Sequence, residues 1–238
     1  MKKKFIIWIL IILFSIIYFP SCKSDTIKKN GIIFEKVTVI KTDKTRIEGY
    51  SVAGSYQNIT VLNIPSSING LPVIKFKDKA FINNTTIKEI IVPNTISRPA
   101  LNLDAPFSGC NNVEKITVPF SAFSGLFFNG GNSSINQRER LPKSLRYLYL
   151  TNDCIEIDSR DFYYCTSLRE IHIPNSVKII NDGGYWASGA KYWDGLPFLG
   201  CSINLRIFCE ANSKPSQWGK YWNYLDAQTP LTVIWGEY

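Results

Sequence analysis

A short block of residues that recurs along the chain constrains the fold more than any other feature of the sequence. Its clearest copy reads Leu168-Arg-Glu-Ile-His-Ile-Pro174. Four related blocks begin at Ile59, Ile87, Val113 and Leu145, so that successive starts lie 28, 26, 32 and 23 residues apart. Self-similarity at periods of roughly 20 to 50 residues is the signature of repeat architectures. The chain is therefore expected to fold as a stack of similar small units.

A phenylalanine precedes most blocks and supplies a second repeating position. It lies six residues before the start in three cases, at Phe81, Phe107 and Phe162. A large aromatic ring at this position is expected to fill the wall of each unit that lies opposite the strand.

The last copy differs by one residue. Phe198 lies seven residues before Leu205, the apolar residue that would begin the block. We therefore begin the last block at Asn204, which places Ile207 and Cys209 at the fourth and sixth positions. Those positions are apolar in the other copies.

The pattern of the block predicts a short strand. Its first, fourth and sixth positions are apolar, whereas its second, third and often its fifth are polar. Alternate side chains of a strand point to opposite faces, so one face of each unit is expected to be buried. The proline that follows several blocks lacks an N–H donor and ends the strand. Stacked units bury their apolar faces against one another and form a parallel ladder.

These residues resemble the BspA-like leucine-rich repeats of bacterial surface proteins. The best copy runs from Phe162 to Ile180 and includes Ile173-Pro174-Asn175-Ser176-Val177. The resemblance covers roughly residues 31–236. It implies a β-rich, right-handed leucine-rich-repeat solenoid with short strands, turns, short helical segments and an N-terminal β-hairpin cap. It also implies a role in adhesion, through contact with a host or its matrix.

An open stack needs a cap at each end, because otherwise apolar surface and strand edges stay exposed. Residues 31–58 alternate well enough to form a hairpin cap around Thr42-Asp43-Lys44-Thr45. Residues 59–238 hold about six repeats and a C-terminal cap that contains Trp218 and Trp222. The polar residues 22–30 are expected to be a tether.

Residues 1–21 are typical of a lipoprotein signal peptide. Three lysines at positions 2–4 precede an apolar run from Phe5 to Phe19, which is short for a stable membrane span. The sequence Phe19-Pro20-Ser21-Cys22 resembles a lipobox, although Phe19 and Pro20 depart from its usual residues, and this implies lipidation of Cys22. The alternative is an uncleaved anchor with an incidental cysteine. Both place residues 23–238 outside the cytoplasmic membrane. Together with the family resemblance, the lipid anchor predicts a location in the bacterial cell envelope, exposed at its surface.

Charge gives no support to a nucleic-acid partner. The formal charge of the whole chain is +8, but loss of residues 1–21 leaves 27 − 3 = 24 basic against 19 acidic groups, or +5. No run of Lys and Arg longer than two remains, whereas nucleic-acid binding needs a concentrated basic patch. Membrane contact is expected through the lipid anchor only.

The remaining cysteines are expected to be structural thiols. Cys110, Cys165 and Cys201 each lie three residues after a repeat phenylalanine, where a small side chain can be buried. Five thiols remain beside Cys22, so they cannot all pair, but oxidation between ladder neighbours stays open. No Cys-x-x-Cys or close His/Cys cluster occurs, so neither a metal nor a cofactor is predicted.

No catalytic residue is predicted. His172 is the single histidine, and strand parity places it on the outer face as an exposed residue. The carboxylate pairs Glu156/Asp158 and Asp158/Asp161 are typical of solvated turns. Because nothing marks a nucleophile or an acid–base pair, the chain is expected not to be an enzyme.

The outward positions of the strands are the first candidate binding surface. Tyrosine and arginine are the usual anchors of binding surfaces, although an exposed sheet also uses such residues for cross-strand packing. The candidates are Arg146, Tyr147, Tyr149, Arg169, Glu170 and His172, with Lys88 and Glu89 on the same face.

Two insertions break the short period, and the second is another candidate surface. Residues 120–143 carry several phenylalanines, and residues 182–196 carry the pairs Tyr185-Trp186 and Tyr192-Trp193 between glycines. These rings either form an exposed platform for a sugar or protein, or fold back over the stack.

The sequence therefore predicts a lipid-anchored surface protein that binds a protein ligand of a host or its matrix. One alternative is carbohydrate binding through residues 182–196. The other is a structural envelope protein without a specific ligand.

Overall fold

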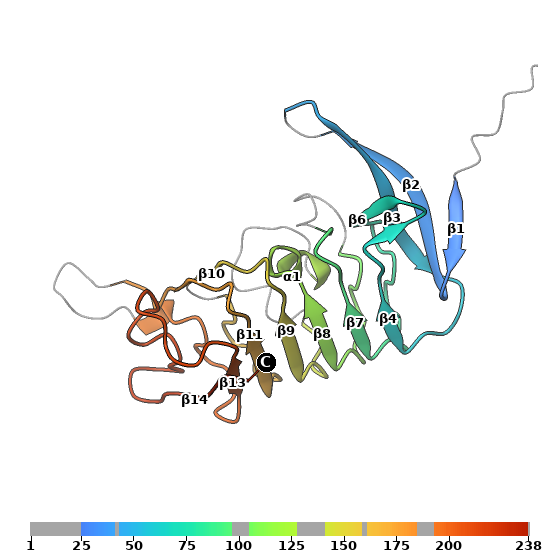
Figure 1. The fold of residues 1–238 in the computed structure, drawn as a ribbon. Helices are drawn as coiled ribbons and strands as arrows, with labels where there is room; N and C mark the ends of the chain where they lie inside the picture. The colour runs from blue at the N-terminus through green and yellow to red at the C-terminus, as the bar shows by residue number, and fades with distance from the viewer. Residues whose placement is uncertain are drawn as a thin grey trace, which may run out of the picture.

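A computed structural model describes residues 25–40, 43–96, 105–127, 141–158, 161–184 and 193–237. Its short parallel strands lie side by side in one ladder (Figure 1). A hairpin lies at the N-terminal end of the ladder, and an aromatic-rich region of irregular structure lies at the C-terminal end. The predicted β-rich repeat fold is thus confirmed.

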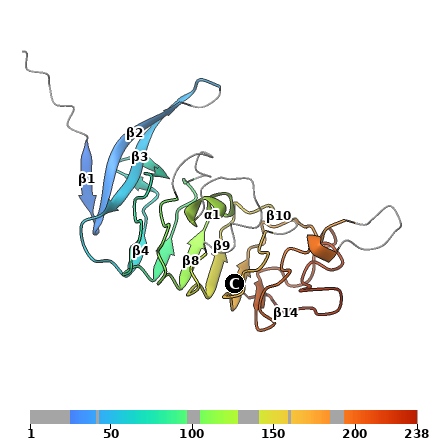
Figure 2. The ribbon, with the colours of Figure 1, turned by 180° about the vertical axis from the view of Figure 1, so that it is seen from behind.

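The N-terminal cap is a five-stranded sheet in the order β1-β2-β3-β6-β5. Its strands are β1 (Thr26–Lys29), β2 (Ile32–Ile40), β3 (Arg46–Ser55), β5 (Ser67–Ile68) and β6 (Leu71–Phe76). β2 and β3 form the expected antiparallel hairpin, and its far end projects from the body in both views (Figures 1 and 2). β1 pairs with β2 and lies within the segment expected to be a tether, so the cap begins earlier than the sequence predicts.

The repeats form a seven-stranded parallel sheet in the order β14-β13-β11-β9-β8-β7-β4. Its strands are β4 (Val61–Asn63), β7 (Glu89–Ile91), β8 (Lys115–Val118), β9 (Tyr147–Leu150), β11 (Glu170–Ile173), β13 (Arg206–Cys209) and β14 (Thr232–Trp235). Each strand pairs with the one from the neighbouring repeat, as a quasi-one-dimensional stack requires.

The register of this sheet is the register of the sequence blocks. Val61 pairs with Glu89, Glu89 with Lys115, Lys115 with Tyr147, and Tyr147 with Glu170. The steps are 89 − 61 = 28, 115 − 89 = 26, 147 − 115 = 32 and 170 − 147 = 23, which equal the steps between block starts. The spacing of the blocks therefore predicted the strand pairing correctly.

The last block keeps the strand register but shifts its first buried residue. Ile207 pairs with Ile171, as a start at Asn204 predicts. However, Asn204 is exposed and Leu205 is fully buried in its place. The chain therefore enters β13 with its apolar side chain one position later than in the other repeats.

The wall opposite the sheet is built from turns and short elements. These are β10 (Glu156–Ile157), which pairs in parallel with β12 (Ile179–Ile180), the helix α1 (Phe120–Phe127) and the 3-10 turn η2 (Trp193–Gly195). The repeat phenylalanines stack along this wall in two groups. The rings of Phe81 and Phe107 are nearly parallel with centroids 5.1 Å apart, and those of Phe162 and Phe198 are 5.3 Å apart.

α1 lies in the first insertion and bridges these two groups. The backbone N–H of Phe107 donates to the carbonyl of Leu126 at 3.0 Å. The rings of Phe120 and Phe123 lie 6.0 Å and 6.3 Å from the ring of Phe162. The described part of this insertion therefore continues the buried wall.

Two tryptophans close the C-terminal end. Trp218 and Trp222 are almost fully buried, and their rings meet edge to face at 4.7 Å. The ring of Trp222 meets that of Phe198 edge to face, with centroids 6.5 Å apart. The indole N–H of Trp218 donates to the carbonyl of Val177 at 3.3 Å. One hydrophobic cluster therefore runs from the N-terminal cap to these rings.

Candidate functional site

The outward side chains of the parallel sheet form the candidate site, which we call the outer face. In each block the fourth and sixth residues point into the core, so the third and fifth point outward from the strand. The second residue lies where the chain bends into the strand, and its carbonyl accepts two backbone N–H groups from the next repeat, as Arg146 does from residues 169 and 170. Each strand therefore adds about three side chains to this face.

Three planar rings stack across the outer face. The rings of Tyr149 and His172 have centroids 3.9 Å apart at an angle of 15°. The rings of His172 and Phe208 are 4.6 Å apart at 5°. Strand pairing causes this arrangement, because His172 is the cross-strand partner of both Tyr149 and Phe208.

This stack corrects the expectation that His172 is an exposed residue. The side chain lies on the outer face, as parity predicts, but His172 is only 7% exposed because its two faces are covered by neighbouring rings. Burial lowers the pKa of His172 below its usual value, against the opposing effect of Glu170. The neutral imidazole is the form that suits the stack near neutral pH.

Cations cover the two ends of the ring stack. The Lys115 ammonium lies 5.0 Å from the ring centroid of Tyr149, and the Arg206 guanidinium lies 5.3 Å from that of Phe208. Both distances permit cation–π attraction. Glu170 contacts Arg206 on one side and lies 3.7 Å from His172 Nε2 on the other.

Tyr147 is the most exposed aromatic residue at the centre of this face. It is 38% exposed and pairs across the ladder with Lys115 and Glu170. The sheet fixes its backbone, and its outward ring is accessible.

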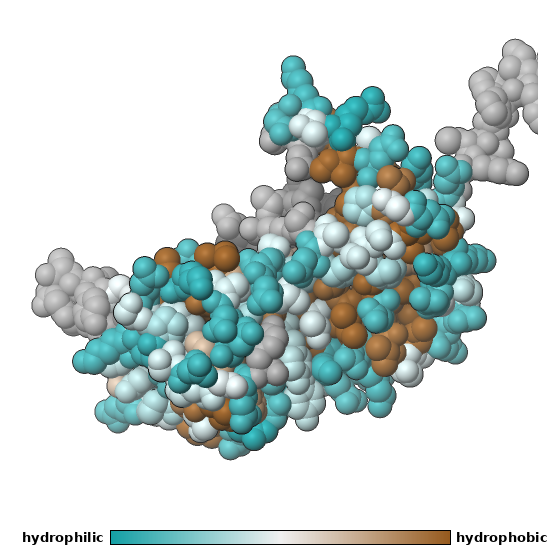
Figure 3. Space-filling view, viewed as in Figure 1, coloured by the Kyte–Doolittle hydropathy of each residue, from teal (hydrophilic) through white to brown (hydrophobic). Residues whose placement is uncertain are grey.

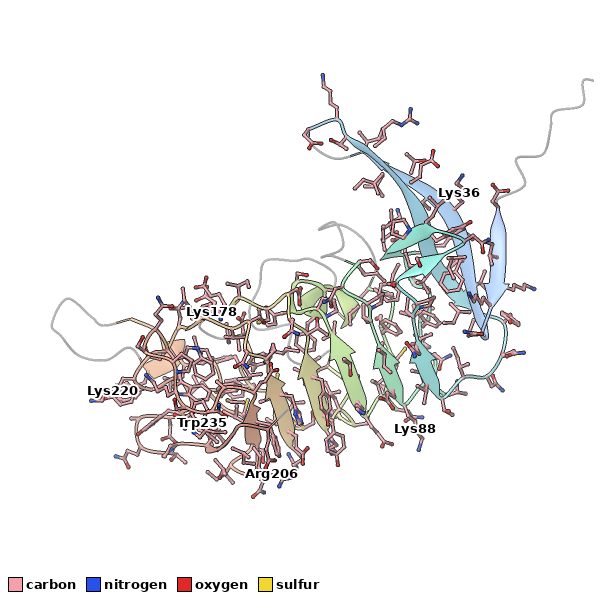
Figure 4. The ribbon with its side chains drawn as sticks, in the orientation of Figure 1. Lys36, Lys88, Lys178, Arg206, Lys220 and Trp235 are labelled. Carbon is pink, nitrogen blue, oxygen red and sulfur yellow. The ribbon has the colours of Figure 1, made fainter. Side chains whose placement is uncertain are left out.

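Two arginines lie where β9 and β11 begin. The Nη1 group of Arg146 donates to the carbonyl of Lys143 at 2.7 Å and of Ser167 at 3.2 Å. The Nη1 group of Arg169 donates to the carbonyl of Leu168 at 2.8 Å and also to that of Ser167 at 3.2 Å. Figure 4 shows two further cations, Lys88 and Arg206, along the same edge of the sheet. The predicted strand-face residues are therefore brought together, as their shared block positions indicate.

The outer face changes in character along the ladder. At the N-terminal end β4 presents Val61, which is 50% exposed, and β7 presents the half-buried Ile91. Apolar atoms gather around this end of the molecule, whereas the C-terminal part of the same view is mostly polar (Figure 3). Aromatic and charged residues are concentrated on β8, β9, β11 and β13.

Three residues of this face were missing from the sequence candidates. Lys115, Arg206 and Phe208 occupy the outward positions of β8 and β13. The block register, extended to every repeat, would have found them, because they hold the same positions as Glu170 and His172.

The second insertion is only partly described, and its described ends pack onto the C-terminal cap. Trp193 meets the ring of Tyr221 edge to face at 4.9 Å. The Asp182 carboxylate accepts the backbone N–H of Tyr221 at 2.7 Å. The other candidates of this loop, Tyr185, Trp186 and Tyr192, lie outside the described residues, as does Cys22.

The five described cysteines are buried free thiols. The Cys110 and Cys201 thiols each donate to the carbonyl of a repeat phenylalanine, Phe81 and Phe162 respectively, at 3.0 Å. Burial raises the pKa of Cys110 to about 11 and the pKa of Cys154 to about 12. The thiolate is the reactive form of cysteine, and a raised pKa keeps these thiols protonated near neutral pH. Their role is therefore packing.

The acidic residues of the described part of the chain serve structure rather than metal binding. No group of three or more His, Cys, Asp or Glu residues there could hold a metal ion. Of the carboxylates noted in the sequence, Glu156 and Asp158 accept hydrogen bonds from the Asn181 amide at 2.8 Å and 3.1 Å. No helix among the described residues is long and apolar enough to cross a membrane.

Comparison with known proteins identifies the repeats. The family model of the BspA type leucine rich repeat region matches residues 30–133 and 133–191 in six copies. No curated protein matches the chain.

Several solved structures are similar to the chain. A leucine-rich repeat protein from Bacteroides capillosus is 18% identical, and the match covers 78% of this chain and 99% of that protein with a TM-score of 0.33. The Treponema pallidum (T. pallidum) leucine-rich repeat protein is 19% identical over 82% of this chain and 88% of its own, with a TM-score of 0.35. A leucine-rich cell surface protein from Faecalibacterium prausnitzii is 13% identical over 89% of this chain and 55% of its own, also with a TM-score of 0.35.

Proposed function

Because the chain belongs to the family of BspA-type leucine-rich repeat regions, we propose that it is a non-catalytic module that binds a protein through its outer face. The observation that carries this proposal is the ring stack of Tyr149, His172 and Phe208 with cations at both ends. It joins three strands into one surface of fixed shape.

Pre-organisation is what makes such a surface suitable for binding. Association costs roughly 0.5–1.5 kcal/mol for each flexible side chain that becomes ordered. The stacked rings and the arginines bonded to backbone carbonyls are already ordered in the free protein. Tyr147 adds an exposed ring beside them, and tyrosine and arginine are the residues that most often dominate binding energy.

The expected partner is a protein of a host surface or its matrix. The test is binding of the purified chain to a panel of purified extracellular matrix proteins by surface plasmon resonance. Tyr147→Ala is expected to weaken the binding about tenfold or more, which corresponds to roughly 1.4 kcal/mol.

A matched control variant distinguishes binding through the outer face from non-specific binding by exposed aromatic residues. Tyr164 is 48% exposed, but it belongs to a turn rather than to the parallel sheet. Tyr164→Ala is expected to bind as the unaltered chain does. Equal losses in the two variants, or no binding to any member of the panel, would count against the outer face.

We also propose that the chain is a lipoprotein displayed at the bacterial surface. The support is the signal-like segment before Cys22, together with the description of the F. prausnitzii relative as a cell surface protein. Cys22→Ala is expected to abolish lipidation, which mass spectrometry and membrane fractionation would detect. An unchanged mass and an unchanged membrane fraction would refute the anchor without affecting the binding proposal.

A further inference from the structure

Arg146 and Arg169 form a pair of like charges at the edge of the outer face. They are the second residues of neighbouring blocks, so strand pairing places them side by side. Both guanidinium groups donate to the carbonyl of Ser167, each at 3.2 Å. A shared acceptor holds the two cations close to each other.

This pair differs from the other cations of the face. Lys88 lies 3.5 Å from Glu114, Lys115 lies 3.0 Å from Glu89, and Arg206 contacts Glu170. Among the described residues, no carboxylate lies within ion-pair distance of Arg146 or Arg169. In the described part of the chain, the groups that accept hydrogen bonds from these two guanidinium ions are backbone carbonyls.

The bonding pattern leaves a specific set of donors. Each arginine directs Nη1 to the carbonyls, so Nε and Nη2 have no partner among the described residues. An arginine presents five N–H donors in a planar fork that fits a carboxylate. Two forks anchored at their inner edge can therefore receive one anion between them, at little further cost in ordering.

The surroundings indicate which kind of anion fits. Glu114 lies next to Arg146 in the row of second block positions, and Glu170 follows Arg169 on β11. A polyanion with closely repeated charges would meet these carboxylates on both sides of the arginines. A single carboxylate with apolar neighbours would reach the arginines without meeting Glu114 and Glu170. Tyr147 offers an exposed ring beside Arg146 on which such an apolar neighbour could pack.

On these grounds we propose that Arg146 and Arg169 form an acidic-peptide clamp, which binds an Asp or Glu side chain of the partner next to an apolar residue seated on Tyr147. The proposal rests on the protein-binding function proposed above and specifies the chemistry of its partner.

The test is selection of random dodecapeptides displayed on phage against the immobilised full chain, followed by affinity measurement with the selected peptides in synthetic form. The selected peptides are expected to carry Asp or Glu beside an aromatic or aliphatic residue. Arg146→Gln and Arg169→Gln should each weaken their binding about tenfold or more. Replacing the acidic residue of the peptide by its amide should weaken binding to the unaltered chain by a similar factor. The same replacement should not weaken binding further in the chain that carries both Arg146→Gln and Arg169→Gln.

Two variants control for folding and for general charge. Lys178→Gln removes an exposed cation beside β12, on the wall opposite the outer face, where its ammonium donates to the carbonyl of Asn175 at 2.9 Å, and should change the affinity less than twofold. Arg146→Lys keeps the charge but not the fork, and should bind more weakly than the unaltered chain and more tightly than Arg146→Gln. Circular dichroism and thermal unfolding would establish that each variant retains the fold.

Each contrary outcome overturns the clamp. Selected peptides without acidic residues, or peptides that bind the arginine variants normally, would refute it while leaving the outer face as a protein-binding surface. Arginine-dependent binding of heparin without such binding of acidic peptides would assign the pair to a sulfated polysaccharide instead. If no peptide is selected, the clamp fails, and the Tyr147 variant with matrix proteins decides the proposed function separately.

Discussion

The inward and outward side chains of the same strands differ in how varied their chemistry is from one repeat to the next. The inward residues of β9 and β11 are Leu148, Leu150, Ile171 and Ile173, all at most 1% exposed and close in size. The outward residues of these strands are Tyr147, Tyr149, Glu170 and His172, which differ in charge, shape and hydrogen bonding. A buried row tolerates exchange of one aliphatic residue for another because it needs mainly volume and apolarity. The outward row is where one repeat can be distinguished from the next.

The largest expected effect comes from breaking the inward row. Leu148→Ala removes a fully buried side chain between β8 and β11, and large-to-small changes of this type cost about 2–5 kcal/mol. Chemical denaturation followed by circular dichroism would measure the change in the free energy of unfolding.

The adjacent outward residue sharpens this test. Tyr147→Ala is expected to lower the free energy of unfolding by less than about 1 kcal/mol, because the side chain is 38% exposed and points outward from β9. If the two substitutions destabilised the chain equally, the division between the two rows would be wrong.

A smaller effect is expected at His172, which belongs to the outward row by position but is buried. Its pKa is lowered in the folded chain, mainly by burial and also by Lys115, whereas Glu170 acts in the opposite direction. As the pH falls below about 6.5, the unfolded chain takes up a proton more readily than the folded chain, so stability decreases. His172→Phe keeps a ring between Tyr149 and Phe208 and removes this proton uptake.

Thermal unfolding at pH 7.5 and pH 5.0 would measure that difference. The variant is expected to lose less stability than the unaltered chain between the two values, and both effects should be smaller than that of Leu148→Ala. An identical pH dependence of stability in the two chains would contradict the prediction that the pKa of His172 is lower in the folded chain than in the unfolded chain.

The repeating part of the fold could be predicted because it is encoded locally. The first, fourth and sixth residues of a block define the inward row, and the proline after it marks where the strand ends. These signals were sufficient to predict the pairing of Val61 with Glu89 and of Tyr147 with Glu170. They also predicted the pairing of Ile207 with Ile171, although the apolar residue before it had shifted.

The features that were missed depend on contacts between repeats. His172 is buried because Tyr149 and Phe208 come from two other blocks, and neither is near it in the sequence. The outward parity of His172 was predicted correctly, but parity alone does not say what covers a side chain. The ordering of Arg146 likewise depends on the Ser167 carbonyl of the next repeat. β1 was missed because its polar composition indicates a tether, whereas its pairing partner is supplied by β2.

The short steps between consecutive strands of the ladder have a consequence for the order of folding. Each pairing in the parallel sheet closes a loop between consecutive repeats, and the longest step, 206 − 170 = 36 residues, is only moderately longer than the shortest, 170 − 147 = 23. The entropy of loop closure differs by only about 0.4 kcal/mol between such lengths. Chain topology therefore gives no pairing a substantial kinetic advantage, and nucleation should follow local packing. Ring contacts join consecutive repeats in two places, at Phe76, Phe81 and Phe107 and again at Phe162, Phe198 and Trp222. The first turns to form are therefore expected at these two aromatic groups.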